Sequence, residues 1–277
     1  MRMVITDRFV YIHMPKTGGT FVTELLLRLH GSPVGESGGD GGAGSAGRLA
    51  RKLFVRPNHY GPIENLEPKH GTCHDIPPRH GNKPVVSTVR NPYDWYVSQY
   101  EFAWWKQTFR YHPEPYPTPA GAAIEEVLPR FVETHSRFPD ISFAEFIELC
   151  HQAARRLDAQ NGPALGLLTH SFIRYHYRHP ERVLENPRAH PGPRGPELFD
   201  VQFLRTDRLN QELHDYLLAA GYREADLRFI RDHDRILPMG RGRPADQTWQ
   251  DYYTPELRRA VREADRFLFE MFPEFDV

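Results

Sequence analysis

The stretch that decides the fold is RFVYIHMPKTGGT, residues 8–20. Its first half is mostly apolar, aromatic or β-branched, a pattern typical of a buried strand, and Pro15 ends that strand. Residues 20–30, TFVTELLLRLH, place leucines and a phenylalanine at helical spacing, and Gly31 follows as a stop signal. A strand, a glycine turn and a helix are therefore expected in succession.

The same arrangement recurs twice further along the chain. The run PVVSTV, residues 84–89, leads into Arg90, and a helix is expected from Pro92. A third strand, residues 200–207, precedes an amphipathic helix that Gly221 would end. Strands that alternate with helices predict an α/β fold of three layers, with a central, mostly parallel sheet and helices on both faces.

The rest of the chain is less regular. Residues 31–47 are rich in glycine and serine and predict a flexible loop. Between residues 106 and 196, proline-rich segments interrupt two helical stretches, 122–131 and 143–157, and much of this part is expected on the surface. One long helix is expected from Thr254 and Pro255 to the end of FLFEMF. Residues 1–277 are predicted to form a single domain.

Composition narrows the possible partners and compartments. The formal net charge is −1, so no global field draws the protein to nucleic acid or to an anionic membrane. Two cysteines without a CxxC spacing predict neither a disulfide framework nor a metal site. No apolar run approaches the length of a membrane span. We expect a soluble, cytoplasmic protein.

The first candidate site is the turn of Pro15, Lys16, Thr17, Gly18, Gly19 and Thr20. Backbone N–H groups at a helix amino terminus have no partner within the helix, and together with the helix dipole they attract anions. The glycines let the backbone curl close to a ligand, while Lys16 and Thr20 supply a charge and a hydroxyl. The alternative is an ordinary strand-to-helix turn with a solvated lysine.

The second candidate site is formed by Arg90 and Ser98 in STVRNPYDWYVSQY. Arg90 follows a strand whose carboxyl end should lie at the same sheet edge as the first turn, and ligands bind at that edge of parallel sheets. Arginine offers a planar fork to phosphate, and serine offers a short hydroxyl donor. The alternative is that Arg90 pairs with Asp94 and that Ser98 is an ordinary helix residue.

Together the two motifs resemble those of sulfotransferases. YIHMPKTGGT is similar to their 5′-phosphosulfate loop, and VRNPYDWYVSQY is similar to their 3′-phosphate motif of an Arg with a Ser eight positions later. The likeness is greatest to the carbohydrate O-sulfotransferases and their bacterial relatives. It covers residues 8–102 and, more loosely, the carboxyl end. It implies a P-loop-like sulfotransferase fold and 3′-phosphoadenosine 5′-phosphosulfate as co-substrate, without a metal.

The resemblance also implies roles for individual residues. Lys16 would stabilise the charge that grows on the leaving phosphate, helped by the backbone N–H groups of residues 17–20. His70, followed by Asp75 and Ile76, fits the position of the general base, and His74 is the second candidate. The acceptor, a small molecule or a saccharide that offers a hydroxyl or an amine, would bind to residues 104–197, an acceptor-binding or lid segment without recognisable motifs.

Two other functions remain open from the residues alone. A kinase would use Lys16 for ATP and Thr17 for Mg²⁺, and a binding protein would hold the nucleotide without transfer. There are two weaker site candidates. One is the loop that contains Arg241 and Arg243. The other is a group of aromatic residues that lines an acceptor pocket or belongs to the core: Trp104, Trp105, Phe109, Tyr111 and Tyr116.

Overall fold

The computed structural model describes residues 3–31, 60–66, 71–103, 105–106, 119–158, 165–186, 195–233, 243 and 246–277. The chain divides into two compact units, and each is discontinuous in sequence. The first unit comprises Met1–Arg90 and Asp200–Arg241, and the second comprises Asn91–Phe199 and Gly242–Val277. The single domain expected over residues 1–277 stays a prediction. The glycine- and serine-rich loop, from residue 32 onward, lies outside the described residues.

The first unit is built on a five-stranded sheet in the order β3-β1-β2-β4-β5. Neighbouring strands β2, β4 and β5 are parallel, whereas β1 is antiparallel to both β2 and β3, so four of the five described strands run the same way. The predicted α/β class with a mostly parallel sheet is confirmed. The strands are β1 (Met3–Ile5), β2 (Val10–Ile12), β3 (Glu64–Leu66), β4 (Val85–Val89) and β5 (Val201–Arg205).

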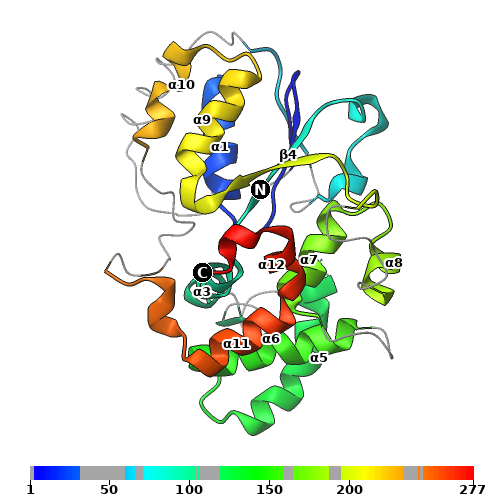
Figure 1. Cartoon of the computed structure of the whole chain (residues 1–277), viewed down its shortest axis with the longest axis vertical. Helices are drawn as coiled ribbons and strands as arrows, with labels where there is room; N and C mark the ends of the chain where they lie inside the picture. The colour runs from blue at the N-terminus through cyan, green and yellow to red at the C-terminus, as the bar shows by residue number, and fades with distance from the viewer. Residues whose placement is uncertain are drawn as a thin grey trace, which may run out of the picture. The chain divides into compact units, whose positions relative to one another are not determined.

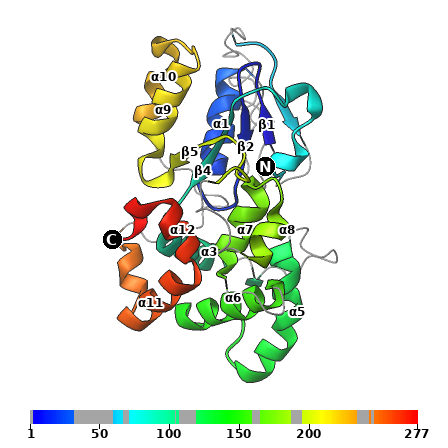
Figure 2. The same ribbon diagram turned by 45° about the vertical axis from the view of Figure 1, so that its right-hand side comes forward.

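Three helices pack against one face of this sheet: α1 (Gly19–Leu29), α9 (Leu209–Ala219) and α10 (Glu224–Arg231). Their apolar residues share a buried cluster with Val4, Tyr11, Val86 and Leu204, which the strand register places on the same face. Figure 1 and Figure 2 show α9 and α10 beside α1. Burial of this apolar surface is the main force that holds the helices to the strands.

The predicted starts and stops of two helices are confirmed. Helix α1 follows Gly18, whose φ of 94° is left-handed, and it ends before Gly31, whose φ is 64°. Helix α9 ends before Gly221, with a φ of 84°. Each of these glycines takes a backbone conformation that other residues rarely adopt, which is why glycine marks the boundaries of these helices in the sequence.

The second unit contains only helices among its described elements of regular structure. The predicted helix at residues 143–157 is confirmed as α6, and its amino terminus is closed by reciprocal hydrogen bonds between Ser142 and Glu145. The α-helices of this unit are α3 (Pro92–Phe102), α5 (Pro119–Thr134), α6 (Phe143–Leu157), α7 (Leu167–His176), α8 (Pro180–Glu185), α11 (Pro255–Ala264) and α12 (Arg266–Met271), and short 3₁₀ turns lie at Trp249–Tyr252 and Pro273–Phe275.

The middle of the chain is more buried than its proline content suggested. Phe146 and Leu149 on α6 and Phe172 on α7 have no exposed surface, so these helices contribute to the core of the second unit. Helix α6 also carries exposed residues, so this part of the chain contributes both to the core and to the surface of the second unit. The prolines that suggested a surface location fall largely outside the described residues, at 113–118 and 187–193.

The long carboxyl-terminal helix that the sequence predicted is broken at Asp265 into α11 and α12. Asp265 is completely buried, and its carboxylate accepts hydrogen bonds from the Tyr96 hydroxyl and from both the backbone N–H and the hydroxyl of Thr169, each at 2.8 Å. Burial raises the pKa of Asp265 from the usual 3.8 to about 6, and these hydrogen bonds oppose the rise. Helix α11 thus ends just before Asp265, the residue whose side chain accepts these hydrogen bonds from α7 and α3.

Asp265 serves as the amino-terminal cap of α7. That helix begins after Gly166, which has no side chain to accept from the first free N–H groups, and Thr169 is the third residue of the helix. A Cβ atom on Gly166 would collide with the Asp265 carboxyl group. The Asp265 carboxyl group therefore lies where a side chain of residue 166 would otherwise be. The cap of α7 therefore comes from a residue 96 positions along the chain from Thr169.

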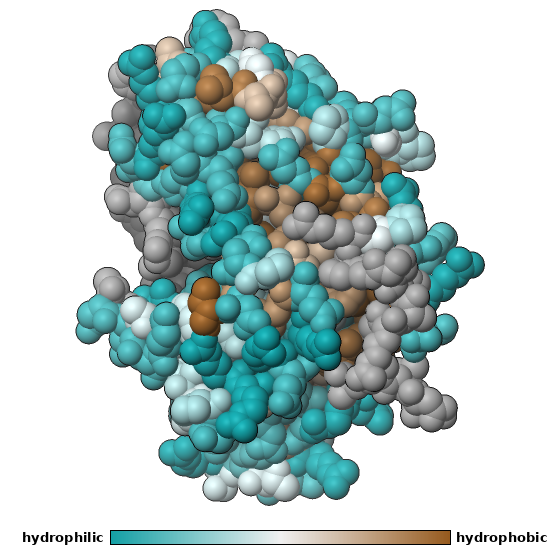
Figure 3. Space-filling model, viewed as in Figure 1, coloured by the Kyte–Doolittle hydropathy of each residue, from teal (hydrophilic) through white to brown (hydrophobic). Residues whose placement is uncertain are grey.

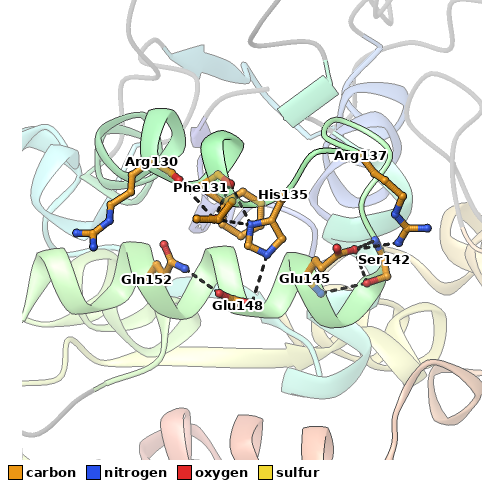
Figure 4. A network of polar contacts seen from close by, with 9 residues as sticks. Arg130, Phe131, His135, Arg137, Ser142, Glu145, Glu148 and Gln152 are labelled. Atoms are coloured by element: carbon orange, nitrogen blue, oxygen red, sulfur yellow. Dashed lines mark hydrogen bonds and ion pairs between the residues drawn. The ribbon is translucent and has the colours of Figure 1, made fainter.

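Helices α5 and α6 are joined through His135, as Figure 4 shows. Its Nδ1 lies 2.9 Å from the Phe131 carbonyl oxygen in the last turn of α5, and its Nε2 lies 3.5 Å from a Glu148 carboxylate oxygen on α6. The ring also stacks on Phe131 with 3.8 Å between centroids. These contacts fix the pairing of two helices in the segment for which the sequence predicted acceptor binding.

Figure 3 shows hydrophilic side chains over much of the face that it presents, together with a hydrophobic area above its centre. Among the described residues, Leu218 and Val277 are the exposed large hydrophobic ones. No helix in the described part of the chain has the length and apolar character needed to cross a membrane.

Candidate functional site

The turn that follows β2 has an unusual backbone. Lys16 has a φ of 64°, and Gly18 has a φ of 94°, so two of three consecutive residues are left-handed. A left-handed conformation costs roughly 1 kcal/mol or more for a residue with a Cβ atom. Lys16 therefore holds a strained position between a strand and a helix, and conformations of this kind cluster at functional sites.

The two glycines of the turn make room for protein side chains. A Cβ atom on Gly18 would lie 2.5 Å from Leu209 Cδ2, and one on Gly19 would overlap the ring of His13. The sequence predicted that both glycines let a ligand approach the backbone closely. In the structure, the space beside them is filled by the first unit itself, so approach of an anion to the N–H groups of the turn stays a prediction.

Both threonines of the motif are buried. Thr17 Oγ1 donates to the Met14 carbonyl oxygen at 2.8 Å and lies 2.7 Å from Thr88 Oγ1 on β4. Thr88 Oγ1 also lies 3.1 Å from the Tyr11 hydroxyl, so three side chains connect the turn to β2 and β4. Thr20 lies in the first turn of α1 and is 7% exposed. The Thr17 hydroxyl thus fastens the turn to the sheet.

Lys16 and Arg90 come together at the carboxyl ends of β2 and β4, as the sequence analysis predicted for the two motifs. Arg90 Nη1 donates to the backbone carbonyl oxygen of Lys16 at 3.1 Å. Burial, and secondarily the positive charge of Arg90, lowers the pKa of Lys16 from the usual 10.5 to about 8. Two cationic groups at one strand edge produce a locally positive field in a chain whose net charge is −1.

Thr206 completes this edge, and the sequence analysis did not identify it. It directly follows β5, and its Oγ1 lies 2.9 Å from the carbonyl oxygens of both Thr17 and Val89. Its single hydroxyl proton is shared between these two acceptors. The sequence predicted a strand over residues 200–207, so Thr206 was expected inside that strand, whereas β5 ends one residue before it at Arg205.

Ser98 and its neighbours belong to the second unit. Ser98 is half-buried in the second turn of α3, eight residues after Arg90. Asp94, the alternative partner of Arg90, forms an ion pair with Arg243, with 2.5 Å between Arg243 Nη1 and Asp94 Oδ1. Arg243, expected to be a solvated or nucleotide-binding residue, thus pairs with a carboxylate in the first turn of α3. The role of Ser98 in binding a 3′-phosphate stays a prediction.

The candidate bases are only partly described. His70 lies outside the described residues, together with Arg241, Trp104, Phe109, Tyr111 and Tyr116. His74 is exposed in a 3₁₀ turn, Cys73–Asp75, whose start is closed by Asp75: its carboxylate accepts from the backbone N–H of Thr72 at 2.7 Å. Asp75, which the resemblance places five residues after the base, therefore has a structural task in the described turn.

Trp105 resolves one of the two alternatives for the aromatic group. It is 1% exposed and stacks on Phe146 with 4.7 Å between ring centroids, so it is a core residue of the second unit. In the described part of the chain, no group of three or more His, Cys, Asp or Glu side chains is placed to hold a metal ion. The absence of a metal from the function stays a prediction.

Comparison with known proteins identifies no relative. No family model matches the chain. No curated protein and no solved structure matches it either.

Proposed function

We propose that this protein is a sulfotransferase, which moves a sulfuryl group from 3′-phosphoadenosine 5′-phosphosulfate onto a hydroxyl or amine of a small molecule or saccharide. The proposal includes a three-layer, P-loop-like sulfotransferase fold with helices on both faces of the sheet. The segment of residues 104–197 would bind the acceptor. The observation that carries the proposal is the meeting of Lys16 and Arg90 at one strand edge.

This meeting supports an anionic ligand for a physical reason. Two positive groups brought together raise each other's free energy, and a bound anion removes that cost. The strained backbone of Lys16 and the start of α1 lie at the same place, and N–H groups at a helix start complement phosphate. The sequence motifs then predict the orientation of the nucleotide. Its 5′-phosphosulfate would bind at Lys16, and its 3′-phosphate would bind at Arg90 and Ser98.

The transfer itself is an in-line displacement. The acceptor oxygen attacks sulfur, a new S–O bond forms, and the bond from sulfur to the bridging oxygen of the 5′-phosphate breaks with its electron pair. Lys16 would stabilise the charge that develops on that phosphate oxygen. The proton of the acceptor passes to a base, for which His70 is the first candidate and His74 the second. Positioning and electrostatics account for most of the rate.

The kinase alternative is weakened by the position of Thr17. A hydroxyl that binds Mg²⁺ in a phosphate loop must face the ligand. The Thr17 side chain is completely buried, and its hydroxyl contacts Met14 and Thr88. Binding a metal would require it to leave both partners.

Adenosine 3′,5′-bisphosphate is expected to bind at least tenfold more tightly than 5′-AMP or ATP. Without a 3′-phosphate, Arg90 and Ser98 lose a charge-assisted contact of about 1.5 to 3 kcal/mol, which corresponds to about tenfold or more in affinity. Isothermal titration calorimetry with the three nucleotides measures this difference. Equal affinities would refute the assignment of the second motif, and turnover that disappears in EDTA and returns with Mg²⁺ would favour a kinase.

Affinity for adenosine 3′,5′-bisphosphate is also expected to fall as the pH rises through about 8, the value to which the pKa of Lys16 is lowered. Below this pH, Lys16 carries its proton and attracts the 5′-phosphate, and above it the attraction is lost. A bound anion favours the charged form, so the midpoint in the complex should lie above that of the free protein. Titrations between pH 6.5 and 9.5 test this, and Lys16→Met should remove the dependence. An identical dependence in Lys16→Met would contradict the assignment.

A further inference from the structure

The carbonyl groups of the anion-binding turn are held by two side chains from other strands. Arg90, after β4, donates to the Lys16 carbonyl oxygen at 3.1 Å, and Thr206, after β5, contacts the Thr17 carbonyl oxygen at 2.9 Å. Thr206 also contacts the Val89 carbonyl oxygen at 2.9 Å. One hydroxyl therefore joins the ends of three strands that lie next to each other in the sheet, β2, β4 and β5.

The direction of the Thr17 carbonyl determines the direction of the next N–H group. In a planar trans peptide, the C=O and the following N–H point in opposite directions. Because the Thr17 carbonyl oxygen faces Thr206, the N–H of Gly18 points away from Thr206. Glycine has no Cβ atom, so its backbone is freer than that of other residues, and the contact with Thr206 helps to fix the orientation of the peptide before Gly18.

The contact to Val89 gives Thr206 a second effect. Val89 immediately precedes Arg90, the residue assigned to the 3′-phosphate. One hydroxyl therefore holds the turn around Lys16 and the strand end before Arg90 in fixed positions relative to each other. Hydrogen-bond donors that are already oriented contribute more to binding than donors that must reorder, because the entropy of ordering them is lost during folding and not on binding.

We infer that Thr206 is a positioning residue of the nucleotide site, which orients the Gly18 N–H toward the 5′-phosphate and holds the Lys16 turn in register with Arg90. This inference rests on the proposed function. Thr206 acts through the backbone of its two partners and does not itself need to touch the ligand.

The test compares four proteins by calorimetry, with adenosine 3′,5′-bisphosphate as the probe. Thr206→Val removes the hydroxyl and keeps the shape, and it should weaken binding by about tenfold, the effect of one lost hydrogen bond. Thr206→Ser keeps the hydroxyl and should restore affinity to within about threefold of wild type. Thr23→Val is the matched control, because Thr23 is a buried threonine on α1 whose hydroxyl has no hydrogen-bond partner among the described residues.

The outcomes separate the two claims. If wild type binds and Thr206→Val binds equally well, Thr206 does not position the site, and the inference is wrong while the proposed function stands. If wild type does not bind the nucleotide, the proposed function fails and the inference fails with it. A loss in Thr206→Val that Thr206→Ser does not restore would indicate a merely structural role and overturn the inference. Should Thr206→Val not fold, Thr206→Ala is measured in its place with the same expected loss.

Discussion

Replacing Lys16 with alanine is expected to lower the kcat/KM of sulfuryl transfer by about 10² to 10³-fold, the usual effect of removing one charged stabiliser of a developing anion. Both binding and chemistry should suffer, because the Lys16 ammonium group would contact the bound donor and also the charge that grows on its phosphate. Transfer of ³⁵S from the labelled donor to an acceptor library, followed by mass spectrometry of the products, measures this loss.

Arg266→Ala is the control for this experiment. Arg266 is an exposed cationic residue of α12, outside the segment proposed for the acceptor, and its Nε lies 2.6 Å from a carboxylate oxygen of Glu270. Exposed ion pairs contribute little to stability, so this variant should keep wild-type activity. If Lys16→Ala turned over at the rate of Arg266→Ala, the assignment of Lys16 as the leaving-group stabiliser would be wrong.

Replacing Asp265 with alanine is expected to destabilise the protein by about 2 to 4 kcal/mol. The change leaves three buried donors without their acceptor: the N–H and the hydroxyl of Thr169 and the hydroxyl of Tyr96. It also removes the cap of α7, and Gly166 has no side chain to replace it. Urea unfolding monitored by circular dichroism measures the change in the free energy of unfolding.

Asp140→Ala is the control, because it removes an equally charged side chain from an exposed ion pair. It should change the free energy of unfolding by less than about 1 kcal/mol. Similar values for the two variants would show that the cap supplied by Asp265 does not matter for stability. The experiment is best carried out at a constant pH well above 6, because the pKa of Asp265 is raised to about 6 and its carboxyl group changes charge near that pH.

Local signals explain what the sequence predicted well. Helix α1 and the turn before it follow from adjacent features: an apolar run, Pro15, two glycines and a leucine-rich period. Helix α6 lies at the residues predicted for it, and the structure shows a capping box of Ser142 and Glu145 at its start. In both cases the information lies within about a dozen neighbouring residues.

Contacts between distant residues explain what was missed. Strands β1 and β3 have three residues each, too few for a period to be read, and β3 exists because Met3, Val4 and Ile5 offer it a partner. The break at Asp265 could not be foreseen, because ELRRAVREADRFLFEMF is a continuous helical pattern and the reason for the break lies on α7 and α3. Thr206 contacts a turn 189 residues away, a separation that no local pattern reports.

The order in which the chain is synthesised gives the division into two units a further consequence. Strand β5 completes the sheet beside β4, yet the whole stretch Asn91–Phe199 emerges from the ribosome between them. Until then the nascent sheet has β4 at an open edge, and the turn around Lys16 lacks the hydroxyl of Thr206. In the same way, helix α7 lacks the cap that Asp265 supplies until that residue has been translated. Both units are therefore completed late, and the turn around Lys16 gains its contact with Thr206 only after most of the protein has been translated.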